Sequence, residues 1–142
     1  MGKLNNLLGR MASPFKPYAN CLLRIGLGIS FFLHGYGKLP SRADFLGWPP
    51  WHLVAWGEIL AGLGILFGGL IGIRAASLGN VITRLSGGAV GVIMIGALII
   101  WHSDWAIFIG EVIGEEKQGV LFASEQLFLL LLGIYFAIKG ND

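Results

Sequence analysis

The stretch Arg24–Lys38, RIGLGISFFLHGYGK, decides the fold class of this chain. Apolar residues and glycines fill its middle, an arginine stands at one end, and His34, Gly35 and Lys38 stand at the other. Such a run is typical of a transmembrane helix, and ionisable groups within it are costly in hydrocarbon unless they are paired or hydrated. The stretch therefore predicts a membrane-spanning helix whose polar ends are the first place to look for function.

The composition of the whole chain agrees with this interpretation. Hydrophobic residues make up 55% of the 142 residues, charged residues only 13%, and the mean hydropathy is +0.73. A soluble domain needs a far more charged surface. The charges are too few and scattered for a nucleic-acid interface. Cys21 is the only cysteine, which excludes an intramolecular disulfide, a Cys-x-x-Cys pair and a cysteine-based zinc site within one chain.

Four apolar segments predict an all-α membrane protein built as a bundle of four transmembrane helices. Each segment has close to the roughly 20 residues that cross a bilayer. We place the spans at 20–38, 52–73, 77–101 and 119–138, all within a transmembrane domain of residues 20–142. Residues 1–19 form a separate amphipathic segment for the membrane surface, because its apolar side chains share one helical face, namely Leu4, Leu7, Leu8 and Met11.

The two longer connections carry their own signals. Prolines separate the first two spans, with Trp48 and Trp51 as expected interface anchors. The connection before the fourth span places Trp105, Phe108 and Val112 at helical spacing, which predicts a short surface helix there.

Basic residues set the expected orientation. One side of the predicted bundle has more of them than the other, so the positive-inside rule puts both termini in the cytoplasm. The richer side has Lys3, Arg10, Lys16, Arg74, Arg84 and Lys139, and the poorer side has Lys38, Arg42 and Lys117. Arg84 either belongs to an interfacial part of the third span or snorkels toward the interface.

All four spans bring a polar group to the outward half of the bundle, judged from about 1.5 Å of rise per residue. These groups are His34, Glu58, His102 and Glu125. Mutual pairing would lower their cost in the bilayer, so we expect both glutamates to face inward toward the histidines and Lys38. Gly35 leaves room for a ligand or for another helix. The cluster is either a binding site or an ion-pair network that only holds the helices in register.

Two further interpretations concern metal and Arg24. His34, His102, Glu58 and Glu125 could form a two-histidine, two-carboxylate site, but no local ligand spacing supports it, and we predict neither a metal nor a haem. Arg24 lies near the cytoplasmic end of its span, where it either snorkels to a phosphate headgroup or takes part in function.

These residues also carry a family resemblance. LLRIGLGISFFLHGYGKL, WGEILAGLGILFG, IGIRAA and SEQLFLLLLGIYFAIKG occur in order over about four-fifths of the chain, which is similar to the DoxX-like family of small four-helix integral membrane proteins. The resemblance implies a multi-pass protein of the bacterial inner membrane, often linked to quinone-dependent oxidation, as in the thiosulfate-to-quinone oxidoreductases. It singles out nine positions, Arg24, His34, Gly35, Lys38, Glu58, Gly62, Arg74, His102 and Glu125.

The function expected from this is that of a membrane subunit in a quinone-linked redox complex. A quinone is the expected cofactor, with Arg24, His34, Gly35, Lys38, Glu58, His102 and Glu125 as its binding residues. His34, Glu58 and Glu125 are the candidates for proton transfer, and Lys38 or Arg24 would polarise an oxygen. Expected partners are the lipid bilayer, other membrane redox proteins and a second copy of the chain. The alternatives are a scaffold without chemistry of its own and a small proton-coupled transporter that uses Glu58, Glu125 and His34.

Overall fold

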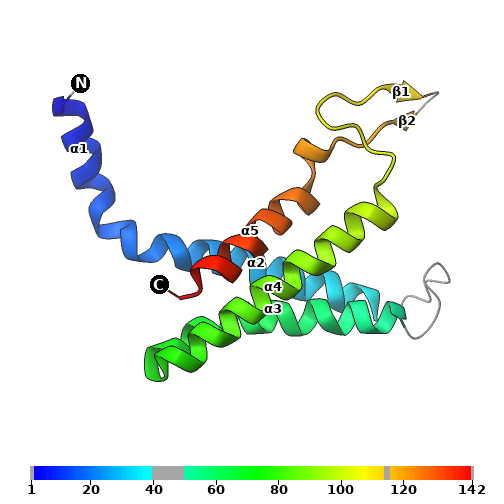
Figure 1. The fold of residues 1–142 in the computed structure, drawn as a ribbon. Helices are drawn as coiled ribbons and strands as arrows, with labels where there is room; N and C mark the ends of the chain where they lie inside the picture. The colour runs from blue at the N-terminus through cyan, green and yellow to red at the C-terminus, as the bar shows by residue number, and fades with distance from the viewer. Residues whose placement is uncertain (1, 40–49, 114–115, 142) are drawn as a thin grey trace.

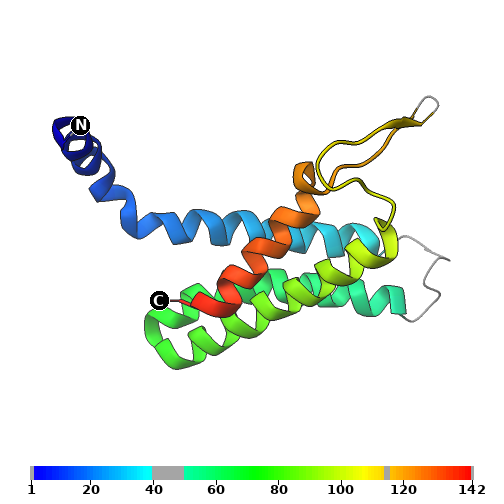
Figure 2. The same ribbon diagram turned by 45° about the horizontal axis from the view of Figure 1, so that its top comes forward.

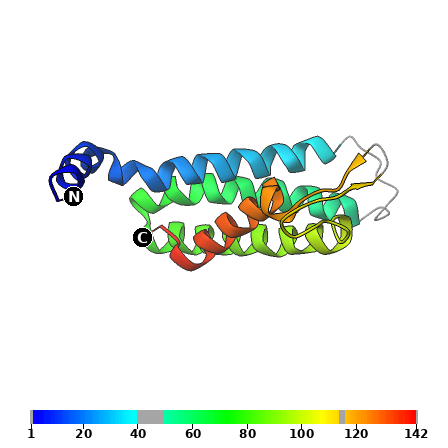
Figure 3. The same ribbon diagram turned by 90° about the horizontal axis from the view of Figure 1, so that it is seen from above.

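A computed structural model of the chain describes residues 2–39, 50–113 and 116–141. Four helices form a bundle, namely α2 (Lys16–Lys38), α3 (Pro50–Arg74), α4 (Ala76–Trp101) and α5 (Glu125–Lys139). Helix α3 packs against both α2 and α4, and α5 packs mainly against α4 (Figure 1). Seen from above, α2, α3 and α4 run side by side while α5 crosses obliquely (Figure 3). The prediction of a helical protein is confirmed.

Two of these helices, α3 and α4, are long and apolar enough to cross a membrane. Helix α5 is shorter than predicted, because its 15 residues correspond to a length of about 22 Å. The expected start of this helix at residue 119 is wrong. A short 3₁₀ helix, η2 (Leu121–Ala123), comes first, and the hydroxyl of Ser124 then caps α5 by accepting a hydrogen bond from the backbone N–H of Leu127 at 3.2 Å.

Glycines bring the helix backbones close together. A Cβ at Gly62 would lie 2.6 Å from the carbonyl oxygen of Gly28, and a Cβ at Gly79 would overlap the backbone of Gly72. Real side chains do not tolerate such distances, so α2 meets α3, and α3 meets α4, through glycine contacts. Gly35 belongs to the same group, because a Cβ there would overlap the carbonyl of Ala55. The sequence left open whether the space beside Gly35 holds a ligand or another helix, and in the structure it holds helix α3.

The core lies between these glycine contacts. It is made of large side chains that are almost completely buried, contributed by all four helices, and includes Leu27, Phe31, Ile65, Val90 and Phe136. Their burial fixes which face of each helix points inward. The polar residues nearer the helix ends, such as His34 one turn beyond Phe31, are thereby positioned as well.

The N-terminal segment forms a helix of its own, α1 (Gly2–Ala12), followed by a 3₁₀ turn, η1 (Ser13–Phe15). It projects away from the bundle at a marked angle to α2 (Figures 1 and 2). Pro14 and Pro17 lie at this bend, since proline does not continue a regular helix from the preceding turn. All its large apolar side chains are exposed, namely Leu4, Leu7, Leu8 and Met11.

The connection between α4 and α5 is extended, and the surface helix predicted for it is wrong. Strands β1 (Val112–Ile113) and β2 (Glu116–Lys117) form a small antiparallel hairpin that projects from the bundle (Figure 2). Closer to the helices, Ala106 pairs with Val120, and the Trp105 ring lies against Gly119. The run Ile107–Ile109 is aromatic and β-branched, which favours extended backbone despite the helical spacing of its neighbours. The anchor Trp48 and the basic Arg42 lie outside the described residues.

Candidate functional site

A cavity of about 440 Å³ lies at the end of the bundle where α2 ends and α3 begins. We call this end, marked by Lys38, Pro50, Trp101 and Glu125, the loop end. All four helices contribute to the cavity wall, which is mostly apolar. The polar lining side chains are His34, Lys38, Glu58, His102 and Gln126. The volume and the few polar groups are those of a small-molecule site.

The polar part of the wall is built around an ion pair between α2 and α3. Glu58 is one of the most deeply buried side chains of the protein, with 1% of its surface exposed, and its Oε1 accepts a hydrogen bond from Lys38 Nζ. The Lys38 ammonium also lies 5.6 Å from the centre of the Trp51 ring. Oε2 of Glu58 is buried and has no hydrogen-bond partner among the described residues. One oxygen of the carboxylate is therefore without a donor.

A second polar contact connects α2 with α5. His34 Nε2 lies 3.3 Å from Glu125 Oε1, which also accepts a hydrogen bond from Ser30 Oγ at 2.9 Å. The expected pairing of Glu125 with a histidine is present, but the carboxylate is not inside the bundle, because 57% of its side chain is exposed and it does not line the cavity. The reason is the late start of α5, which makes Glu125 the first residue of the helix instead of a residue two turns inside it.

Aromatic rings close the loop end of the cavity. The centroids of the Trp51 and Trp101 rings lie 5.6 Å apart, and both residues line the cavity. The Trp51 indole donates a hydrogen bond to the carbonyl of Lys38 at 3.2 Å. His102 follows directly after α4, and its ring lies 3.9 Å from that of Trp105. The site thus combines flat apolar surfaces with hydrogen-bonding groups on one wall.

Arg24 lies elsewhere, and the expectation that it reaches a headgroup is wrong. It is buried toward the opposite end of the bundle, where its Nη1 donates to the carbonyl of Ile65 at 2.5 Å and to Thr83 Oγ1 at 3.0 Å. Its Nη2 donates to Asn141 Oδ1 at 2.7 Å, and the guanidinium lies 4.9 Å from the centre of the Phe136 ring. These contacts give it a position among the helices rather than at their surface.

Of the residues singled out in the sequence, the structure brings His34, Lys38, Glu58 and His102 to one cavity and puts Glu125 beside His34. Gly35 and Gly62 are helix contacts, Arg24 lies in a separate cluster, and Arg74 is exposed at the end of α3. Arg84 caps α5 by donating to the carbonyl of Ile138 at 2.6 Å. No group of three or more metal-ligating side chains gathers within the described ranges.

Among the polar and aromatic residues of the cavity wall, the sequence did not identify Trp51, Trp101 and Gln126 as site residues. Gln126 carried a usable signal, since an amide inside an apolar segment needs a partner as a carboxylate does. Trp51 was expected to anchor the interface, and nothing in the sequence distinguishes that role from lining a cavity.

Comparison with protein-family models, with curated protein sequences and with solved structures finds no match to this chain.

Proposed function

We infer that this chain is a four-span integral membrane protein that holds a quinone-class ring in the cavity at the loop end, as a subunit of a quinone-linked redox complex. The observation that carries the proposal is the cavity itself, with its apolar wall, its flanking tryptophans and the buried Lys38–Glu58 pair. A quinone is a flat apolar ring with polar oxygens at its edge, and this wall offers matching surfaces for both parts.

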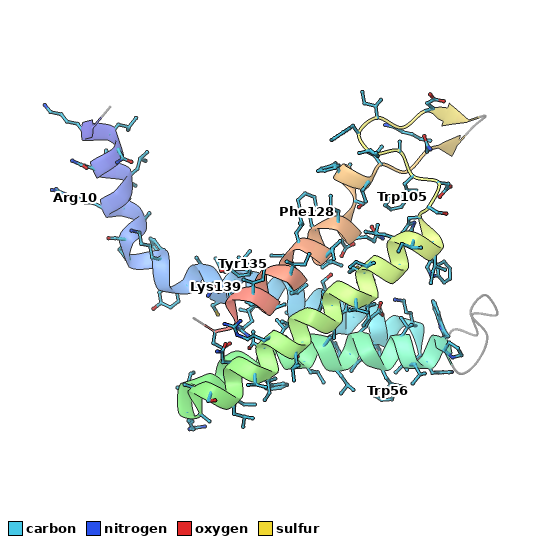
Figure 4. The ribbon with its side chains drawn as sticks, viewed as in Figure 1. Arg10, Trp56, Trp105, Phe128, Tyr135 and Lys139 are labelled. Carbon is cyan, nitrogen blue, oxygen red and sulfur yellow. The ribbon has the colours of Figure 1, made fainter. Side chains whose placement is uncertain are left out.

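The outer surface of the bundle supports a membrane location. Large apolar side chains on all four helices are exposed, among them Leu22, Leu60, Leu85, Val92 and Ile138. Trp56 and Phe128 likewise point away from the bundle (Figure 4). Apolar surface of this extent in water marks an aggregating protein, whereas in hydrocarbon it is the expected exterior. Together with the apolar length of α3 and α4, it favours insertion of the whole bundle. The larger number of basic residues at the end opposite the loop end favours both termini in the cytoplasm.

The residues that would hold the ring are those of the polar wall. Gln126 and His102 can bind a ring oxygen, His34 can donate or accept according to its tautomer, and the Lys38–Glu58 pair fixes the charge on the wall. Trp51 and Trp101 offer surfaces on which a ring can stack. When bound, a quinone supplies a carrier for electrons and protons. The chain's own part is to bind the ring, orient its oxygens and place His34 between the cavity and the exposed Glu125.

The test is purification in mild detergent from the native membrane, followed by mass spectrometry of co-purifying lipids, cofactors and proteins. The proposal predicts a quinone near one copy per chain together with redox partner proteins. Partner proteins without any ring cofactor would favour a scaffold, and neither of the two would favour a transporter. Either of these results would contradict the proposal.

A further inference from the structure

The carboxylate of Glu58 has one oxygen without a hydrogen-bond donor. Its Oε1 is bound by the Lys38 ammonium, whereas Oε2 is buried and has no partner within the part of the chain that the structure describes. A buried carboxylate oxygen that lacks a donor is costly, which is why such atoms are rare in folded proteins. The atom itself is buried, but its residue belongs to the cavity wall, so a donor that reaches Oε2 from the cavity would relieve this cost.

The kind of group that fits Oε2 follows from its chemistry. As the anionic partner of an ammonium group, the carboxylate only accepts hydrogen bonds. A carbonyl oxygen brought beside it would meet another acceptor and be repelled. A hydroxyl group would instead form a charge-assisted hydrogen bond, the stronger kind.

No donor of the described residues is hydrogen-bonded to Oε2, and this includes Gln126 and His102 of the same cavity wall. The Lys38 ammonium donates to Oε1, and the indole N–H of Trp51 donates to the carbonyl of Lys38. His34 is turned toward Glu125 on the neighbouring helix. Since none of the described residues supplies the donor, a ligand in the cavity is the source that we consider.

We propose that the cavity selects ring molecules that carry a hydroxyl donor over those that carry only acceptors, so that it binds the reduced, hydroxyl-bearing form of a quinone more tightly than the oxidised form. This inference rests on the proposed function, because it assumes that a ring occupies the cavity. It adds which redox form the site prefers and assigns the preference to Glu58.

The experiment uses a pair of redox-inert ligands, 4-pentylphenol and its methyl ether. They share the ring and the alkyl chain, and only the phenol has a donor. Both are titrated by calorimetry into the full chain in lipid nanodiscs, with protein-free nanodiscs measuring their partition into lipid. We expect the phenol to bind at least about tenfold more tightly than the ether, because it alone satisfies the carboxylate oxygen.

Three variants locate the preference. Glu58→Gln should bring the two affinities to within about twofold or reverse their order, since an amide nitrogen in place of Oε2 is a donor. Because this variant removes the carboxylate that Lys38 binds, the double variant K38Q/E58Q is measured beside it and should behave in the same way. Glu111→Gln changes an exposed carboxylate outside the cavity and should keep the full preference.

The possible results distinguish a failure of the hydroxyl preference from a failure of the proposed ring-binding function. A phenol preference that disappears in the Glu58 variants supports it. Equal binding of the two ligands, or a preference that survives both Glu58 variants, overturns the inference while leaving a ring-binding cavity. Binding of neither ligand overturns the proposed function as well.

Discussion

Arg24 is held by four neutral groups that come from helices α3, α4 and α5 and from the C-terminal tail. Besides the carbonyl of Ile65, the Thr83 hydroxyl, the Asn141 amide and the Phe136 ring surround its guanidinium. Asn141 also accepts from Thr83 at 2.7 Å and donates to the carbonyl of Gly68 at 2.9 Å. A single side chain thus ties the C-terminal tail to α2, α3 and α4.

We expect Arg24→Ala to lower the free energy of unfolding by about 3 kcal/mol, because it leaves buried acceptors unsatisfied and opens a void. Arg74→Ala removes an exposed arginine at the end of α3 and should change the free energy of unfolding by less than about 0.5 kcal/mol. Unfolding in mixed micelles, followed by circular dichroism, measures both values. Equal losses would show that Arg24 does not connect the helices.

For single residues, the sequence predicts how deep a side chain lies along its helix but not which residues it contacts. The rise of the helix separates Arg24 from His34 and Lys38, and the structure places them in different clusters. The partners Thr83 and Asn141 are 59 and 117 residues away along the chain. Which of them Arg24 meets depends on the rotation of each helix about its axis, and apolar spans that are hydrophobic on every side do not reveal that rotation.

The elements of the bundle are matched to one another by glycine contacts. Gly79 on α4 meets Gly72 on α3, and Gly87 on α4 lies 2.7 Å, measured from an added Cβ, from the carbonyl of Gly133 on α5. Gly88, the next residue, has no atom within 4 Å of the same added group. One face of α4 is therefore fixed by its neighbours and another is open.

Alanine substitutions should distinguish these faces. Gly79→Ala forces α3 and α4 apart and should cost about 2 kcal/mol or more. Gly88→Ala only removes the flexibility of glycine and should be neutral or stabilising by up to about 1 kcal/mol. The melting temperatures of the two variants in the same detergent give the comparison. A destabilised Gly88→Ala beside an unaffected Gly79→Ala would contradict the packing.

The sequence predicts three of the helices within a few residues, because apolar length and flanking prolines mark their ends. It overestimates α5, since apolar residues continue upstream of Ser124 in a segment that is not α-helical. It also assigns a helix to the connection after α4, where apolar spacing alone does not distinguish a helix from extended backbone.

At the scale of the whole molecule, the two ends of the bundle differ in character. The loop end contains the cavity and the Lys38–Glu58 pair, and the opposite end contains the Arg24 cluster and the chain terminus. The sequence predicts that polar groups of several helices lie at a similar depth along the bundle. It does not predict the cavity, because its volume depends on how α5 crosses the other helices.

An inserted bundle of four spans has both of its termini on one side of the membrane. We expect green fluorescent protein fused after Asp142 to fluoresce, and alkaline phosphatase fused at the same place to be inactive, because the basic ends of the helices stay in the cytoplasm. A fusion in the connection after Trp101 should show the reverse. Active phosphatase at the C-terminus would contradict this orientation, because it requires either an inverted bundle with both termini outside or an odd number of spans.

The central claim is that the cavity at the loop end binds a ring molecule, and filling the cavity tests it most directly. Gly96 lines the cavity and has open space beside it, whereas Gly88 has open space on the same helix without lining the cavity. Gly96→Phe and Gly88→Phe are therefore matched variants. The measurement is the melting temperature in mild detergent with and without a short-chain alkyl benzoquinone, in its oxidised and in its reduced form.

We expect at least one of the two forms to raise the melting temperature of the unaltered chain and of Gly88→Phe, because a ligand that binds the folded state stabilises it. We also expect that Gly96→Phe no longer responds. The same rise in all three proteins, or no rise in any of them, would contradict a ring-binding cavity at the loop end.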